Sequence, residues 1–331
     1  MNGPMTLADA AAYCGRSVAS MRRAIRRGQI ARHYRAGPSG PELVLSRPDL
    51  DLWRAAKPAP SGDQADAAPR APSNRWHAGE CIYCGEKGQP LTKEHIIPYS
   101  LNGEWVFEKA SCAACAKITS GFERTVLKGL FRYFRAALNL KTRHRHPTTF
   151  PLAITRNGKT ETIDLSPTDY GAVLMLHDLP LPTHLGGPSQ KPGVTITGQT
   201  TIRVGGLPAA EIKKTYEASE IHFTLTYTPG DFARFLAKMA YGFAAARAID
   251  KGGQAELARL RSCSYVLPAI LGRDENLGMW IGATEPEEVP TLQEAIAVSL
   301  VEIEGDVVAK IRLSGHIKAP TYLVVVGKVP G

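Results

Sequence analysis

The sequence predicts a multidomain α+β protein, and three observations lead to that prediction. Positive charge gathers in two segments: 1–57 holds ten Lys and Arg against four Asp and Glu, and 76–147 holds eleven against six. Between them, 58–75 is rich in Ala, Pro and Ser, a composition that cannot bury a core. Beyond them, 148–331 mixes β-rich runs with a long helical pattern and is long enough for its own core. We therefore expect three domains in these segments, with 58–75 as a flexible linker.

The N-terminal domain, 1–57, begins with two short helical patterns. Thr6 can cap a helix over 7–13. After a turn, Ser17 can cap a second helix over 18–27, which Gly28 ends. The runs 30–35 and 43–45 then predict a small β-hairpin.

The second predicted helix has an apolar face and a basic face. Val18, Met21 and Ile25 recur at helical spacing, so we expect them to pack inward. The opposite face then carries four arginines: Arg22, Arg23, Arg26 and Arg27.

Residues 5–56 resemble the winged helix-turn-helix of excisionase and MerR-type proteins. The matching features are Met5-Thr6-Leu7, Ser17 before the arginine-bearing helix, Gly28-Gln29-Ile30, and the run from Pro48 to Trp53. The resemblance implies that the second helix enters the major groove of DNA and that the hairpin contacts the backbone. Arginine can pair with guanine or hold phosphate, so the four arginines are predicted DNA contacts. The alternative is a solvated basic face on a small structural domain.

Two Cys-x-x-Cys pairs, separated by 27 residues, predict a metal clamp in the central domain. Cys81 with Cys84 and Cys112 with Cys115 supply the four thiolates of a closed, tetrahedral zinc site, which is structural because it has no open position. Gly85 follows the first pair, where such a turn often needs positive φ. The first 25 residues lack the apolar run of a secretory signal. We therefore expect a reducing cytoplasmic, nucleoid-associated location, where paired cysteines favour metal over disulfides; a redox dithiol pair is the alternative.

The dipeptide Glu94-His95 lies between the two cysteine pairs, in the stretch Leu91 to Pro98. Together with the run from Cys112 to Glu123, it resembles HNH (His-Me finger) endonucleases whose ββα-metal core is held by a four-cysteine zinc. The resemblance covers 76 to about 135. It implies that His95 is the general base that activates water and that Glu94 binds a catalytic Mg²⁺ or Mn²⁺. That ion would polarise the phosphate and stabilise the leaving oxygen.

The chain departs from the HNH pattern at Ala116. Many HNH proteins place Asn or His there, directly after the last zinc cysteine, as a second metal ligand. Either water or another residue must therefore complete the metal shell. Glu123 is a candidate, because it comes eight residues after Cys115, about two helical turns on, and can face the same side. A surface carboxylate is the preferred interpretation of Glu123. For His95, the alternative is a hydrogen-bonded core histidine.

The C-terminal segment predicts an α+β domain without a recognisable site motif. An amphipathic helix is expected over 231–249, and its Lys238 and Tyr241 are expected to pack or to reach toward water rather than to form a site. The expected strands are 149–155, 160–165, 194–204, 221–227, 295–303, 307–313 and 322–326.

Charge and motifs together favour a nucleic acid as the partner. The net charges are +6 for 1–57, +5 for 76–147 and −2 for 148–331, so the excess lies in the two segments that carry motifs. The apolar run Leu323 to Val326 is far too short to span a membrane, and we expect no membrane partner. The predicted function is a metal-dependent HNH endonuclease that hydrolyses DNA and is targeted by its helix-turn-helix. Two alternatives stay open: a non-cleaving, zinc-containing DNA-binding regulator, and an HNH nuclease that acts on RNA.

Overall fold

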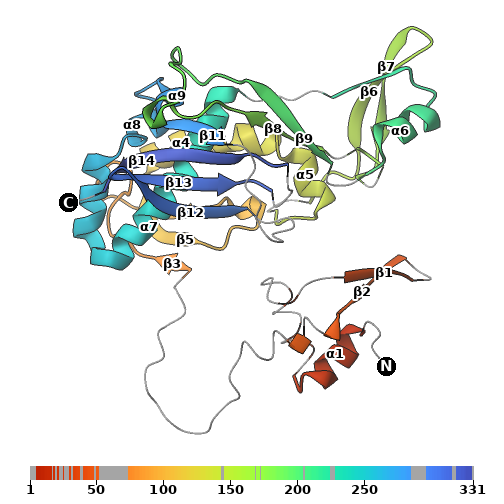
Figure 1. Cartoon of the computed structure of the whole chain (residues 1–331), viewed down its shortest axis with the longest axis horizontal. Coiled ribbons are helices and arrows are strands. Elements are labelled where there is room, and N and C mark those ends of the chain that lie inside the picture. The colour runs from red at the N-terminus through yellow and green to blue at the C-terminus, as the bar shows by residue number, and fades with distance from the viewer. Residues whose placement is uncertain are drawn as a thin grey trace. The chain divides into compact units, whose positions relative to one another are not determined.

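The computed structural model divides the chain into two compact units, Met1–Ala71 and Pro72–Gly331 (Figure 1). The structure describes residues 5–16, 18, 21, 25, 30, 33–37, 40–47, 50, 51 and 74–329, the last range with gaps at 143–144, 168, 172, 204–205, 224–227, 285–295 and 315–317.

The N-terminal unit contains the first predicted helix and the predicted hairpin. Helix α1, Leu7–Tyr13, begins where expected, and the Thr6 hydroxyl accepts a hydrogen bond from the Asp9 amide at 3.3 Å. Strands β1, His33–Gly37, and β2, Gly40–Val44, pair in antiparallel fashion. Both cap and hairpin are therefore confirmed, although each strand is shifted from its predicted bounds.

The small core of this unit confirms two of the three predicted inward residues. Met21 and Ile25 are buried, whereas Val18 is 36% exposed, so the prediction that Val18 packs inward is wrong. The other buried side chains of this core come from α1, from the chain before β1 and from the chain after β2: Ala10, Ala11, Ile30, Leu45 and Leu50. The arginines Arg22, Arg23, Arg26 and Arg27 lie outside the described residues, and so does most of the predicted linker.

The second unit begins with a three-stranded sheet that carries the cysteines. Strands β3, Arg75–Trp76, and β4, Thr92–His95, flank β5, Val106–Ser111, in parallel and antiparallel pairing respectively. Helix α4, Ala113–Lys128, follows directly on β5. Elements β4, β5 and α4 thus form a consecutive strand–strand–helix arrangement.

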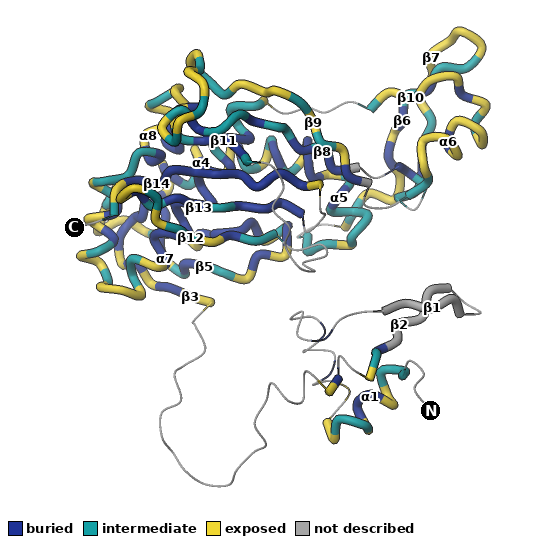
Figure 2. The backbone as a smooth tube through the Cα atoms, viewed as in Figure 1, coloured by how far each residue is buried: buried dark blue, intermediate teal, exposed yellow. Residues whose placement is uncertain are grey.

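A four-stranded antiparallel sheet, in the order β11-β14-β13-β12, forms another layer of this unit. Its strands are β11, Ile281–Thr284; β12, Ala297–Ile303; β13, Asp306–Arg312; and β14, Thr321–Lys328. The three predicted C-terminal strands are confirmed with small shifts, whereas β11 was not predicted. All of β14 except its last residue is buried, which Figure 2 shows as a dark central strand.

The long helix α7, Pro229–Cys263, lies between this sheet and α4 and contacts both. Thr228 caps it by accepting a hydrogen bond from the Asp231 amide at 3.0 Å, and non-helical backbone at Gly252 and Gly253 kinks it. Every described residue from 232 to 246 except Arg234 is buried. This part of the helix is therefore surrounded rather than amphipathic, because a helix that is apolar on all sides belongs inside a core.

A smaller sheet, in the order β10-β6-β7, has a separate core around Phe150 and Tyr170. Its elements are β6, Phe150–Arg156; β7, Lys159–Leu165; and β10, Glu220–His222. The remaining described elements are α5, Arg132–Ala137; β8, Val173–Asp178; β9, Gly198–Arg203; α6, Ala209–Thr215; α8, Leu267–Ile270; α9, Leu277–Trp280; and the 3₁₀ turns Tyr99–Leu101 and Thr183–Leu185.

One hydrophobic core joins the cysteine-bearing sheet to the C-terminal elements. It contains Trp76 of β3, Phe122 of α4, Phe235 of α7 and Val324 of β14. The domain boundary predicted between residues 147 and 148 therefore lies inside one compact unit, and α7 is packed against the segments on both sides of it.

Within the described residues, no helix is both long enough and apolar enough to cross a membrane.

Candidate functional site

The four paired cysteines meet at one point, as their spacing predicts. Their sulfur atoms all lie within 4.8 Å of one another, and Cys84 Sγ is 3.7 Å from Cys112 Sγ. A tetrahedral zinc with Zn–S bonds of about 2.3 Å requires sulfurs about 3.8 Å apart. A disulfide needs an S–S distance of about 2 Å, so these thiols are not oxidised pairs. The donor set and its geometry therefore fit a structural metal ion such as zinc, with Cys81 and Cys115 as the other two ligands.

Local backbone geometry presents each cysteine pair. In the first pair, the Gly85 amide donates to the Cys81 carbonyl at 2.8 Å, and Gly85 has the expected positive φ of 79°. The Ile82 amide donates to the Ala110 carbonyl at 2.8 Å and ties this turn to β5. In the second pair, Cys112 is the N-cap residue of α4, and Cys115 lies in its first turn. Both pairs are thus fixed to the same strand and helix.

Because most of the cysteine cluster is buried, a bound cation would favour its ionised form. Cys81, Cys112 and Cys115 are buried, and Cys84 is exposed. Burial raises the pKa of the Cys81 and Cys115 thiols, and at Cys115 the charge of Cys81 raises the pKa further. Burial opposes ionisation of Cys112 too, but hydrogen bonds to its sulfur lower its pKa overall. A bound zinc ion would supply the charge that keeps all four sulfurs as thiolates.

Glu94 points into the core and meets a lysine that comes from α7. The Lys238 Nζ atom lies 2.5 Å from Glu94 Oε1, 2.6 Å from Glu123 Oε1 and 2.8 Å from the His95 carbonyl oxygen. The side chain of Lys238 is 1% exposed, and that of Glu94 is 9% exposed. We call Glu94, Lys238 and Glu123 the ion triad.

Two expectations from the sequence are corrected by the ion triad. Lys238 does not reach toward water, because its ammonium group is buried between two carboxylates. Glu123 is not a simple surface carboxylate, because its side chain is 19% exposed and contacts that ammonium. Glu123 therefore lies with Glu94 around one cation, as a second ligand would, but the cation belongs to the chain.

The charges of the ion triad support one another. Burial lowers the pKa of Lys238, but Glu123 and Glu94 raise it more, so the net shift is upward and the side chain stays an ammonium. Burial raises the pKa of Glu94, Lys238 opposes that rise, and Glu123 adds to it. The buried Tyr83 hydroxyl also lies near Glu94, but within the described residues it has no hydrogen-bond partner.

His95 is the last residue of β4 and lies on the other side of the strand from Glu94. Successive strand residues point to opposite faces, and the His95 side chain is half-buried. Its ring meets the ring of Tyr99 edge-on, with centroids 5.9 Å apart. Ala116, half-buried on α4, offers no ligand atom. His95 and Glu94 are therefore adjacent in the chain but face different surroundings.

The residues around Glu94 do not fit a catalytic Mg²⁺ or Mn²⁺. In the described part of the chain, the four cysteines form the one group of three or more His, Cys, Asp or Glu ligand atoms within 4.8 Å. Glu94 and Glu123 both form ion pairs with Lys238. Magnesium needs about six oxygen ligands near 2.1 Å, and a buried ammonium between the two carboxylates takes that space.

Helix α7 also holds the backbone of the first cysteine pair, a connection that sequence reasoning missed. The Tyr241 hydroxyl donates to the Ile82 carbonyl at 2.6 Å. Further along the helix, Arg261 pairs with the buried Glu80 at 2.9 Å and donates to the Cys81 carbonyl at 3.4 Å. Lys238 and Tyr241 are three residues apart and lie on one side of α7. Lys238 contacts Glu94 and Glu123 of the ion triad, and Tyr241 contacts the turn of the first cysteine pair.

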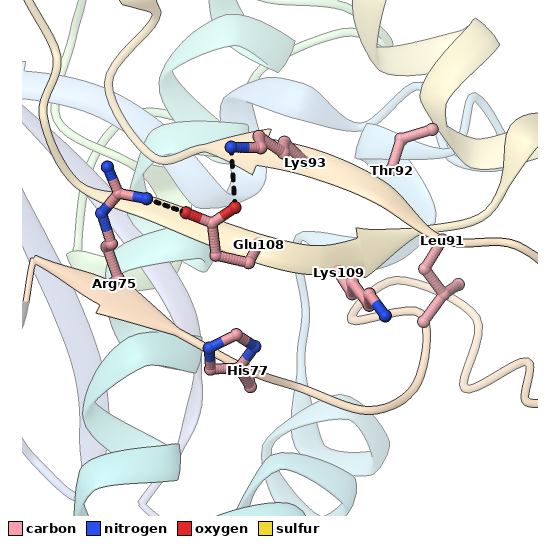
Figure 3. Close-up of a pocket in the computed structure, with 7 residues that line it drawn as sticks. All are labelled: Arg75, His77, Leu91, Thr92, Lys93, Glu108 and Lys109. Atoms are coloured by element: carbon pink, nitrogen blue, oxygen red, sulfur yellow. Dashed lines mark hydrogen bonds and ion pairs between the residues drawn. The ribbon is translucent and has the colours of Figure 1, made fainter.

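A basic pocket of 780 Å³ lies on the outer face of the cysteine-bearing sheet (Figure 3). Arg75 of β3 and Lys93 of β4 approach Glu108 of β5 from the two flanking strands, and Lys93 Nζ is 2.8 Å from the carboxylate. The lining residues are Arg75, His77, Leu91, Thr92, Lys93, Glu108 and Lys109. One carboxylate faces three permanent cations, so the pocket has a positive balance that suits a phosphate.

Comparisons of the chain with protein-family models, with curated proteins and with solved structures found no match.

Proposed function

We propose that the chain is an HNH-type endonuclease that hydrolyses phosphodiester bonds in DNA, with His95 as the general base. One observation supports this proposal most directly. His95 is the last residue of β4, and β4 belongs to the β4–β5–α4 arrangement that contains the cluster of four cysteines. The zinc-ready clamp stabilises that arrangement from outside the reacting centre. Arg22, Arg23, Arg26 and Arg27 of the N-terminal unit are the proposed DNA contacts that bring the substrate near.

In this proposal His95 takes a proton from a water molecule, whose oxygen attacks the phosphorus atom while the bond to the leaving oxygen breaks. The leaving oxygen takes a proton from solvent, and His95 later returns its proton to water. The basic pocket supplies positive charge on the same three-stranded sheet, where Lys93 and Lys109 can hold the phosphate backbone. We assign no step to a divalent ion at Glu94, because the residues there do not fit one.

Incubation of the purified full chain with supercoiled plasmid tests the proposal. Reactions contain Mg²⁺, Mn²⁺ or no added divalent ion, and we compare wild type with His95→Ala and with His222→Ala. His222 is an exposed histidine of β10, in the sheet with the separate core, and serves as the matched control. We expect nicking by wild type and His222→Ala but a loss of about 100-fold or more in His95→Ala. Equal nicking by all three proteins would contradict the proposal. A labelled RNA added as a competitor tests the substrate, and faster cleavage of that RNA would identify RNA as the preferred one.

A second candidate function is a non-cleaving, zinc-containing DNA-binding regulator. The ion triad favours it, because Glu94 is held by Lys238 rather than presented to a metal ion. In that case the plasmid is bound but never nicked, and a gel-shift assay on the same samples distinguishes the two functions.

A further inference from the structure

The ammonium group of Lys238 has no hydrogen-bonding capacity to spare. An ammonium carries three N–H donors. Three oxygens lie around Nζ at 2.5, 2.6 and 2.8 Å, namely one each from Glu94, Glu123 and the His95 carbonyl. The side chain is 1% exposed, so neither water nor a substrate reaches this charge. Lys238 therefore acts on the protein itself and not directly on a bound phosphate.

The two carboxylates come from different elements and converge only because a cation lies between them. Glu94 is on β4 and Glu123 is in the third turn of α4, while Lys238 enters from α7. Two carboxylates that share a buried site repel each other unless a positive charge compensates them. In a protein, either a metal ion or a side-chain ammonium can supply that charge.

We infer that Lys238 takes the place of a divalent ion between Glu94 and Glu123, so that the chain binds no Mg²⁺ or Mn²⁺ at Glu94. The ammonium joins β4 to α4 and holds the main chain at His95, which are the positions that a bound ion would otherwise fix. The inference concerns ion binding alone, and its test needs no cleavage activity.

The test is a titration of the zinc-loaded full chain with Mn²⁺, followed by the electron paramagnetic resonance signal of free Mn²⁺. We compare wild type, Glu94→Gln, Lys238→Ala and the double variant Lys238→Ala/Glu94→Gln. Lys251→Ala, at an exposed position of the same helix, is the control for loss of a lysine. We expect wild type, Glu94→Gln and Lys251→Ala to bind equal amounts of Mn²⁺. Lys238→Ala is expected to bind one further equivalent, which the double variant loses.

Two results overturn the inference. The first is more Mn²⁺ bound by wild type than by Glu94→Gln, which would place an ion at Glu94 despite Lys238. The second is a folded Lys238→Ala that binds no further Mn²⁺, which would mean that this place does not suit an ion. If Lys238→Ala does not fold, the comparison of wild type with Glu94→Gln still decides, because Glu94→Gln keeps the contact between Lys238 and Glu123. The Mn²⁺ titration does not depend on whether the plasmid is nicked. The proposal on ion binding and the proposal on DNA cleavage are therefore tested separately.

Discussion

The cysteine clamp and the ion triad are two centres on the same β4–β5–α4 arrangement. They differ in the source of the positive charge that compensates their anionic side chains. The clamp gathers four soft sulfur ligands, a set that fits a metal ion such as zinc taken up from solution. The ion triad gathers hard carboxylate oxygens around an ammonium that the chain itself provides. The difference teaches that one centre of this scaffold is built to take up a metal ion, whereas the other already contains a cation of the chain.

Both centres are also tied to α7, which explains why the predicted central and C-terminal segments share a core. Tyr241 reaches the cysteine turn, and Lys238 reaches the ion triad. Breaking either centre should therefore loosen the same helix, but with different dependence on metal and on pH.

The largest expected effect is the loss of a clamp ligand. Cys81→Ser should remove zinc and lower the free energy of unfolding of the Pro72–Gly331 unit by more than about 5 kcal/mol, because structural zinc contributes directly to folding. Zinc content by atomic absorption and a thermal melt of the full chain measure this. Cys263→Ser, outside the clamp, should keep the zinc and the melting temperature. A Cys81→Ser protein that stays folded without zinc would show that the clamp is not structural.

The next effect concerns the ion triad. Lys238→Met keeps the length of the side chain and removes its charge, which leaves Glu94 and Glu123 facing each other without a cation. Breaking a buried ion pair by removing one partner costs about 3–5 kcal/mol. Chemical denaturation at neutral pH measures the loss, with the exposed Lys251→Met as the control.

The loss of stability in Lys238→Met should depend on pH, and its direction can be predicted. Burial already raises the pKa of Glu94, and removal of Lys238 takes away the main influence that lowers it. A carboxyl whose folded-state pKa is raised destabilises the fold as pH rises through that pKa. The deficit of Lys238→Met relative to wild type should therefore shrink as pH falls toward 4 and grow toward neutral pH, and the two proteins should hold equal zinc at each pH, although acid releases zinc from both. A deficit that is constant with pH would indicate lost packing rather than lost charge.

The clamp could be predicted from sequence because its information is local. Each Cys-x-x-Cys pair is a single turn, and Gly85 has the conformation that such a turn needs. The ion triad could not be predicted in the same way, since His95 and Lys238 are 143 residues apart and Glu123 and Lys238 are 115 apart. Nothing in a periodic pattern fixes which distant charge a lysine will meet.

A signal for the ion triad was nevertheless present in the sequence. Lys238 is the one charged residue in the run from Phe235 to Ala246, and every residue of that run proved to be buried. A lysine inside such a helix must have a buried partner, since an isolated buried charge is too costly. The assumption of an amphipathic helix, with a lysine free to reach water, concealed this requirement. The buried Glu94 is the carboxylate that meets this lysine.

The smallest expected effects compare two neighbouring tyrosines between the centres. The rings of Tyr83 and Tyr241 stack with centroids 5.9 Å apart, and both side chains are buried. The Tyr241 hydroxyl donates to the Ile82 carbonyl at 2.6 Å, whereas within the described residues the Tyr83 hydroxyl has no hydrogen-bond partner. Tyr241→Phe should therefore cost about 1–3 kcal/mol, because it leaves a carbonyl of the cysteine turn unpaired.

Tyr83→Phe removes a buried hydroxyl that forms no hydrogen bond, so it should change the free energy of unfolding by less than about 0.5 kcal/mol or stabilise the unit. Urea denaturation of the zinc-loaded proteins measures both variants. The two substitutions remove the same atom from adjacent stacked rings, so packing differences nearly cancel. Equal losses in the two variants would mean that the Tyr83 hydroxyl supports Glu94, and the ion triad would then need a fourth member. A loss confined to Tyr241→Phe, accompanied by faster release of zinc to a chelator, would show that α7 stabilises the clamp through the Ile82 carbonyl.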